Sequence, residues 1–325
     1  MTVFAIRRML QALIVVFLMS VIVFFGVNVI GDPVYMLVSP DADQADIEAA
    51  IQRLGLDRPI LEQYWLFLKG AAQGDLGNSF IFGEPALRLI LHHMPATMEL
   101  ALTSLFLSIL LGIPLGLYAG LYPESRVSKT IMASSILGFS LPTFWVGLML
   151  IMIFAVQLGW LPSTGRGDTA VVLGIETSLA TWDGLSHVFL PALNLALTNI
   201  SLTIRLTRAG VREAMSQDYV KFARAKGLSI RRIIFVHVMK NILIPVVTVL
   251  GLEFGSLIAF SVVTESIFAW PGMGKLLIDA ILQLDRPVVV AYLMIIVLFF
   301  VLINLVVDIL YSILDPRVRL QDQGS

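Results

Sequence analysis

A glycine-rich stretch ending in lysine is the first place to look for chemistry, because such loops bind nucleotide phosphates. Gly272-Met273-Gly274-Lys275 has this appearance. A phosphate loop also needs a glycine five residues before Gly274, where this chain has Ala269, and a Ser or Thr directly after the lysine, where it has Leu276. The stretch therefore fails as a nucleotide site, and we expect the isolated chain neither to bind nor to hydrolyse ATP.

The residue types that other catalytic centres need are scarce. The chain has no cysteine, which excludes disulfides, thiolate metal sites and cysteine nucleophiles. It has only four histidines, so a zinc site is not expected. Neither the His-Glu-x-x-His nor the Gly-x-Ser-x-Gly motif of hydrolases occurs. We expect no catalytic residue, no metal and no cofactor.

Composition indicates the class of protein and the kind of helix that it contains. Of the 325 residues, 58% are hydrophobic and only 14% are charged, whereas soluble domains have about a quarter charged residues. A membrane-spanning helix needs roughly 20 apolar residues. Six apolar runs satisfy this length: Met9–Ile30, Met98–Gly120, Ile131–Leu158, Val188–Leu206, Ile242–Val263 and Val288–Tyr311. The sequence predicts an all-α integral membrane protein with about six transmembrane helices.

The first apolar run follows Arg7-Arg8, as a signal peptide would, but it is too long and no cleavage site follows it. Cytoplasmic loops are enriched in Lys and Arg. If the N-terminus is cytoplasmic, most of the 22 Lys and Arg residues lie on that side, nine of them between Arg205 and Lys240. We therefore expect both termini, and this basic segment, to be cytoplasmic.

The basic segment from Asp218 to Pro245 reads as two helices with a break. Asp218 is a candidate N-cap, and Gly227 can end the first helix with a positive φ. Tyr219, Phe222 and Ala223 follow the i, i+3, i+4 spacing of one apolar helix face. Ser229 can cap a second helix that runs into the next span. A short helical knob of this kind suits docking onto a soluble partner.

This segment resembles the EAA-type loop of binding-protein-dependent ABC importer permeases, in the dipeptide/oligopeptide/nickel-type family. The matching residues are Asp218, Tyr219, Ala223 to Leu228, His237, Lys240, Asn241 and Pro245. Phe222 and Val236 depart from the usual pattern. The alternative is a basic cytoplasmic loop whose charges only fix topology.

The resemblance extends over nearly the whole chain. Further matches are Gly55-Leu56-Asp57-x-Pro59, Gly74 to Gly77 with Ser79, Thr264 to Phe268, Trp270 to Lys275, Asn304-Leu305, Asp308, Tyr311 and Asp315-Pro316-Arg317. Ala259 and Phe260 stand where glycines are common in the family, which would narrow whatever that helix face lines.

The resemblance implies a type I ABC importer permease fold in the bacterial inner membrane. It implies four kinds of partner: a second homologous permease, two ATP-binding subunits that hydrolyse ATP, a periplasmic solute-binding protein and the lipid membrane. Nucleic acid is not expected. The residues implied to couple to the ATPase are Asp218, Tyr219, Phe222, Ala223, Arg224, Ala225, Lys226 and Gly227. Di- or oligopeptides are the expected cargo, and nickel, opines, glutathione and oligosaccharides are the alternatives.

We expect four regions along the chain. They are a first transmembrane helix over 1–30, a periplasmic helical loop region over 31–95, the permease core over 96–315 with its coupling loop at 210–241, and a cytoplasmic tail over 316–325. In the loop region, Asp41 or Asp43 can cap a helix that stops at Gly55, and Pro59 suits the first turn of a second helix. This region is a cap on the spans, a surface for the solute-binding protein, or both.

Small and acidic residues inside the spans predict helix packing, a kink and two roles for carboxylates. Gly112, Gly116 and Gly120 form a small-residue face for close helix packing, and Ser140-Leu141-Pro142 predicts a kink in the third span. Glu253 lies mid-way along the fifth span, either on the transport pathway or as a hydrogen-bonded interhelical residue. Asp308 is expected to pair with Arg317 or Arg319.

Two other classes of function remain. An ion-coupled secondary transporter would show coupling carboxylates and an inverted repeat, and neither is clear in this sequence. A structural or sensory membrane anchor would leave transport intact when deleted.

Overall fold

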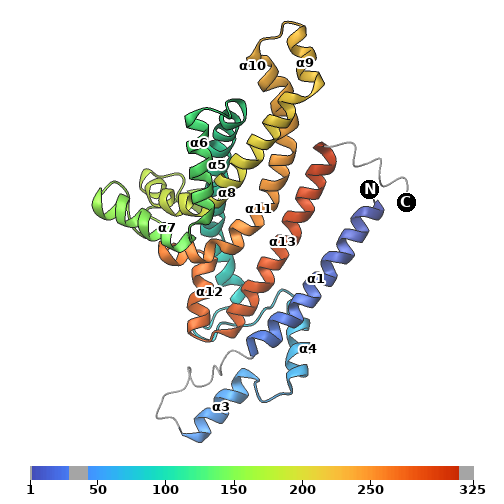
Figure 1. Ribbon diagram of the computed structural model, residues 1–325. Helices are drawn as coiled ribbons and strands as arrows, with labels where there is room; N and C mark the ends of the chain where they lie inside the picture. Colours follow the sequence, from blue (N-terminus) through green and yellow to red (C-terminus); the bar gives the residue numbers. More distant parts are fainter. Residues whose placement is uncertain (1, 29–42, 315–325) are drawn as a thin grey trace.

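The computed structural model describes residues 2–28 and 43–314 as an elongated bundle of helices (Figure 1). One end of the bundle carries α9 (Asp218–Ala225) and α10 (Ile230–Arg232). The other end carries α3 (Gln44–Leu54), α4 (Ile60–Ala71) and α12 (Met273–Leu282). The remaining elements are α1 (Thr2–Asn28), α5 (Ala86–Leu121), α6 (Arg126–Ser140), α7 (Thr143–Leu150), η1 (Ile151–Gln157), β1 (Ala170–Val172), β2 (Ile175–Thr177), α8 (Trp182–Ser216), η2 (Ile233–Val238), α11 (Met239–Ile267) and α13 (Arg286–Leu314), where η marks a π-helical segment.

The helices α5 and α8 form the tightest contact in the bundle, and the small-residue face predicted from the sequence makes it. A Cβ added at Gly112 would lie 2.6 Å from the Thr203 side chain, and one at Gly116 would lie 2.7 Å from the Ile204 carbonyl oxygen. A Cβ at Gly120 would lie 2.6 Å from Val211. Glycine is therefore required at all three positions for the two helices to approach this closely.

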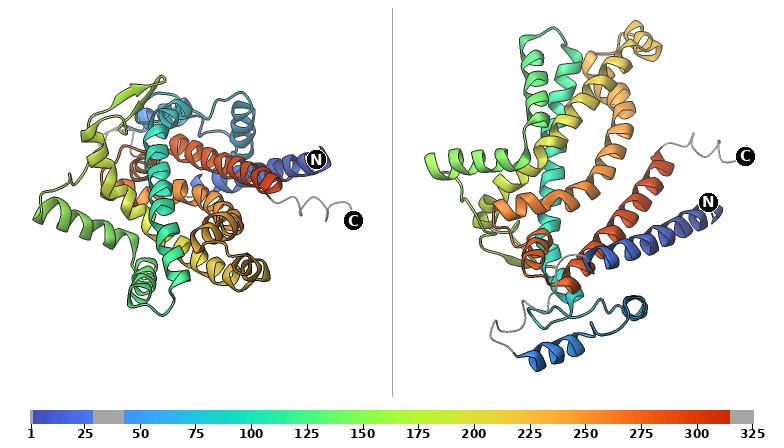
Figure 2. Two further views of the ribbon diagram at one scale, coloured as in Figure 1. Left: turned by 90° about the horizontal axis from the view of Figure 1, so that it is seen from above. Right: turned by 60° about the horizontal axis from the view of Figure 1, so that its bottom comes forward.

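Four helices in the described part of the chain are long and apolar enough to cross a membrane: Ala86–Leu121, Trp182–Ser216, Ile230–Ile267 and Arg286–Val307. The expected first span forms the helix α1. Among the described side chains its apolar stretch is Leu13–Val27, which is shorter than the stretches of the four helices above. Figure 2 shows α1 running beside α13, with which it packs.

The bend predicted at Ser140-Leu141-Pro142 is present, and it is a break between two helices, larger than a kink within one. The two halves of the expected third span, α6 and the α7–η1 segment, meet at 109°. Pro142 forces Leu141 into an extended conformation with φ −80° and ψ 137°, which ends α6 at Ser140. A new helix then starts directly after Pro142.

The end of the molecule that carries α3 and α4 contains the predicted loop helices and some unpredicted structure. Asp43 caps α3 by accepting the Asp46 N–H at 2.9 Å, and Gly55 ends α3 with φ +68°, as expected. Pro59 is the N-cap of α4 and lies one residue before its first turn. The antiparallel hairpin β1–β2 and the helix α12 were not predicted. Asp41, the pairing of Asp308 with Arg317 or Arg319, and the tail over 316–325 lie outside the residues or side chains that the structure describes.

Candidate functional site: the α9 knob and the carboxylates that brace the opposite end

The helix α9 starts one residue earlier than the sequence predicts. Its N-cap is Gln217, with φ −71° and ψ 152°, so the expectation that Asp218 would be the cap was wrong. Asp218 is instead the first helical residue, and its carboxylate accepts a hydrogen bond from Lys221 Nζ at 2.8 Å. This ammonium holds the pKa of the exposed Asp218 carboxyl below its ordinary value. An acidic side chain also interacts favourably with the partial positive charge of the helix N-terminus.

Gly227 ends α9 as the sequence predicts, with φ +76°. The Gly227 N–H donates to the Arg224 carbonyl at 2.9 Å, and the Leu228 N–H donates to the Ala223 carbonyl at 3.2 Å. This pair of bonds is a Schellman motif, which needs a left-handed residue at the glycine position. Ser229 then precedes α10, which continues through η2 into α11. The helix α9 is thus connected to α8 on its N-terminal side and, through a short turn, α10 and η2, to α11 on its C-terminal side.

The helix α9 has one buried and one exposed side. Val220 and Ala223 are almost fully buried and pack in an apolar cluster with residues of α8, η2 and α11. Tyr219 is 38% exposed and Phe222 is 62% exposed, and the Lys226 ammonium lies 4.5 Å from the centre of the Phe222 ring. The sequence placed Ala223 on the same face as Tyr219 and Phe222, but in the structure Ala223 is buried against the bundle while the two aromatic side chains are exposed. Arg224, Ala225 and Lys226 are also exposed.

Glu253 is half-buried on α11. Gly251 and Gly255 bring α11 close to Val307 and Phe300 of α13, so they define a packed face. On the side of Glu253, Phe260 is 72% exposed, whereas Leu250 and Leu257 are buried, so Glu253 lies at the edge of an exposed strip of α11. Its role on a pathway stays a prediction.

Sequence analysis missed three buried carboxylates at the α12 end of the molecule. The first, Glu265, accepts hydrogen bonds from Thr97 Oγ1 and Ser261 Oγ, both at 2.8 Å, and from the Lys275 N–H at 3.0 Å. It therefore caps the N-terminus of α12 from a neighbouring helix. The Gly272 Cα approaches this carboxylate so closely that a Cβ there would lie 2.4 Å from it. The signal was present in the sequence, since Glu265 lies inside the family-like stretch from Thr264 to Phe268.

The other two buried carboxylates hold loops against the spans. Glu99 of α5 binds Arg166 through two bonds of 2.7 and 3.1 Å and also accepts the N–H and the hydroxyl of Ser178. Arg166 also donates to the Glu176 carbonyl, so the β1–β2 hairpin is tied to α5. Asp285, directly before α13, accepts hydrogen bonds from the Ser79 hydroxyl and from the Phe80 N–H. Each of the three carboxylates accepts several hydrogen bonds from neighbouring segments, so its role is to hold those segments in place.

Comparison with known families decides what this arrangement belongs to. Residues 112–320 match the family described as the binding-protein-dependent transport system inner membrane component, and residues 1–101 match the N-terminal family of the same membrane components. The chain belongs to this family of transport permeases. It is therefore a multi-pass inner-membrane permease subunit of an ABC transporter.

Two relatives show how far the similarity of this permease extends. It is 40% identical to the di/tripeptide transport system permease protein DppB of Pseudomonas aeruginosa, over 92% of this chain and 95% of that protein. It is 37% identical to the glutathione transport system permease protein GsiC of Escherichia coli, over 97% of this chain and 98% of that protein.

Solved structures share the fold of the permease. The MetNI methionine ABC transporter in an inward-facing conformation contains a chain that matches with a TM-score of 0.53 at 15% sequence identity. The match covers 70% of this chain and 96% of the other. The predicted ABC importer permease fold is confirmed.

Proposed function

We propose that this permease forms half of a translocation pathway and that α9 is its contact with an ATP-binding subunit. The complete importer would contain a second homologous permease, two ATP-binding subunits and a periplasmic solute-binding protein. The observation that carries this proposal is the two-sided α9, in which Val220 and Ala223 are buried while Tyr219 and Phe222 face outwards. An exposed aromatic pair on a firmly anchored helix has the composition of an interface hot spot.

The proposed mechanism follows from the way α9 is attached. Closure of the ATP-binding subunits on ATP moves α9. In turn α9 moves α8 and α11, because it packs on α8 and on η2, which continues into α11, within one apolar cluster. The spans then switch from inward-facing to outward-facing, the solute-binding protein delivers its cargo, and hydrolysis returns the spans to the inward-facing state. ATP is hydrolysed by the separate subunits.

The topology required by this mechanism places α9 and both termini in the cytoplasm. The basic residues near α9 support this side, because cytoplasmic loops are enriched in Lys and Arg. The β1–β2 hairpin, α3, α4 and α12 are then periplasmic. Glu253 borders the pathway in this proposal, because it is half-buried at the edge of a strip of α11 where Phe260 is exposed.

We propose di- and oligopeptides as the cargo, supported by the similarity to the di/tripeptide permease DppB. Glutathione is the second candidate, because GsiC matches this chain over a larger share of its length. Nickel complexes, opines and oligosaccharides remain alternatives.

Uptake into proteoliposomes tests the function and separates these cargoes. The complete transporter is reconstituted with its solute-binding protein, and labelled dipeptide, oligopeptide and glutathione are compared in the presence of ATP and of a non-hydrolysable analogue. The proposal predicts accumulation only with ATP and binding protein together. Uptake driven by an ion gradient without ATP would instead identify a secondary transporter.

A further inference from the structure

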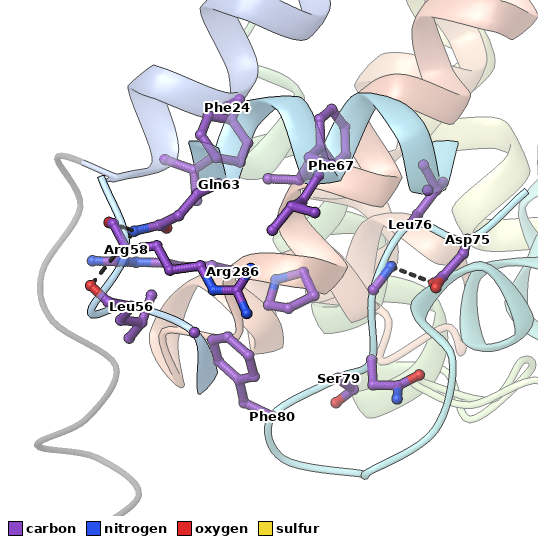
Figure 3. Close-up of a pocket in the computed structure, with 18 of the residues that line it drawn as sticks. Phe24, Leu56, Arg58, Gln63, Phe67, Asp75, Leu76, Ser79, Phe80 and Arg286 are labelled. Carbon is purple, nitrogen blue, oxygen red and sulfur yellow. Dashed lines mark hydrogen bonds between the residues drawn. The ribbon is translucent and has the colours of Figure 1, made fainter. Parts of the chain in front are cut away.

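A pocket of about 980 Å³ lies at the α3–α4 end of the molecule and has no part in the proposed coupling (Figure 3). It is lined by the ends of α1 and α13, by α3 and α4, and by the turn over 75–80. A volume of this size is in the range of ligand pockets in proteins.

The polarity of the lining changes from one side of the pocket to the other. The helices α1 and α13 contribute apolar side chains, namely Phe24, Val27 and Val290. Phe24 and Val27 belong to the apolar stretch of α1. Arg58, from the loop before α4, and Arg286, the first residue of α13, also line the cavity, as Figure 3 shows.

The helix α4, which forms another wall, has the surface of a helix at a membrane interface. Tyr64 and Phe67 pack it against α1, where Phe67 stacks on Phe24 with ring centres 5.4 Å apart and the Tyr64 hydroxyl lies 2.9 Å from Ser20 Oγ. On another face, Leu61 is 71% exposed and Trp65 is 67% exposed. Tryptophan beside exposed leucine is typical of helices at the level of the lipid headgroups.

The cavity thus combines apolar side chains with two guanidinium groups, and it adjoins a helix whose surface is typical of the membrane interface. We propose that it binds a membrane glycerophospholipid. The phosphate lies near Arg58 and Arg286, and an acyl chain follows Phe24 and Val290. The planar fork of arginine suits phosphate oxygens, and a lipid has the same order of apolar and charged groups as this lining.

Asp75 in the pocket lining, and Glu62 outside the lining but paired with Arg58, indicate which headgroup it prefers. Glu62 pairs with Arg58 at 3.2 Å, and Asp75 lines the cavity while accepting the Gly77 N–H at 2.9 Å. With carboxylates and guanidinium groups together, the site suits a headgroup that carries both a phosphate and an amine. Phosphatidylethanolamine therefore fits better than a purely anionic lipid. The bound lipid would hold α1, α4 and α13 together at the membrane surface.

The experiment measures phospholipid retained by the assembled transporter after detergent washing, using native mass spectrometry and lipid extraction. The variants are Arg58→Gln and Leu66→Asp, because both side chains line the pocket and are substantially exposed, so the fold tolerates the change. The control is Arg88→Gln, which removes an exposed arginine of α5 outside the pocket lining.

The proposal predicts one retained phosphatidylethanolamine in the unaltered protein and in Arg88→Gln. Retention should fall by about tenfold in Arg58→Gln, since a lost charge-assisted hydrogen bond is worth at least that factor. Arg58→Lys should restore part of it, adding phosphatidylethanolamine back should refill the site, and inorganic phosphate alone should not displace the lipid. Equal retention in all variants, displacement by free phosphate, or a peptide found in place of the lipid would overturn the proposal.

Discussion

Replacing Gly227 with valine tests whether the shape of the α9 end matters for coupling. Gly227 has φ +76°, and a Cβ added there would meet no atom within 4 Å. The cost of Gly227→Val is therefore backbone strain without a steric clash, about 1–2 kcal/mol for an L-residue in the left-handed region. If the strain is relieved by opening the turn, the bonds from Gly227 and Leu228 back to α9 are lost, and Tyr219 and Phe222 change direction.

An interface that requires the closed turn should then weaken by about five- to thirtyfold, the factor that corresponds to this energy. The assay is co-purification of the ATP-binding subunits with tagged permease, followed by ATP hydrolysis with and without loaded solute-binding protein. We expect Gly227→Val to insert and to pair with the second permease, yet to lose ATPase binding or stimulated hydrolysis. Gly227→Asn should be close to normal, because asparagine tolerates positive φ.

A matched control is Gly83→Val, at a turn with φ +68° that also has no atom within 4 Å of the added Cβ. It imposes the same kind of strain at the opposite end of the molecule, and stimulated hydrolysis should persist. Normal ATPase recovery and normal stimulation in Gly227→Val would refute the reasoning. The basic segment would then serve only to fix topology.

Three further substitutions test the packing and the pathway. Gly116→Ala should destabilise the protein by about 1–3 kcal/mol, because its Cβ would lie 2.7 Å from the Ile204 carbonyl oxygen. In the same thermal unfolding assay, Gly26→Ala should not lower stability, because space is open there and alanine favours the helix. Glu265→Ala should cost about 3–5 kcal/mol, since it leaves three buried donors unpaired, and an unfolding midpoint equal to that of the unaltered protein would contradict this role. Glu253→Gln should preserve assembly but change transport rate or cargo preference; unchanged transport with lower thermal stability would mean that Glu253 is a packing residue.

Features encoded by neighbouring residues were predictable from the sequence. Gly227 and Asp43 act as helix ends because backbone freedom and short-range side-chain bonds decide such positions. The glycine stripe of α5 was predictable because its four-residue spacing is itself the packing surface. The Asp218 cap was misplaced by one residue: Gln217 is the N-cap, and Asp218 is the first helical residue, where its carboxylate pairs with Lys221.

Features that depend on distant residues were not predictable. The position of the break near Pro142 was visible, but its 109° angle depends on how α6 and α7 pack on other helices. Glu99 and Arg166 are 67 residues apart, and no local pattern connects them. The exposure of Phe222 beside buried Ala223 likewise follows from packing on α8 and η2, which periodicity within α9 does not determine.

Site-specific cross-linking tests the central claim most directly, because the chain contains no cysteine of its own. A single cysteine is introduced at Phe222, which is 62% exposed on α9, or at Leu173, which is 98% exposed on the β1–β2 hairpin. Each is labelled with a benzophenone maleimide in the assembled transporter and irradiated. We predict a cross-link from Phe222→Cys to an ATP-binding subunit and none from Leu173→Cys. Failure of Phe222→Cys to reach a co-purifying ATP-binding subunit, or a cross-link from Leu173→Cys to that subunit, would contradict the account.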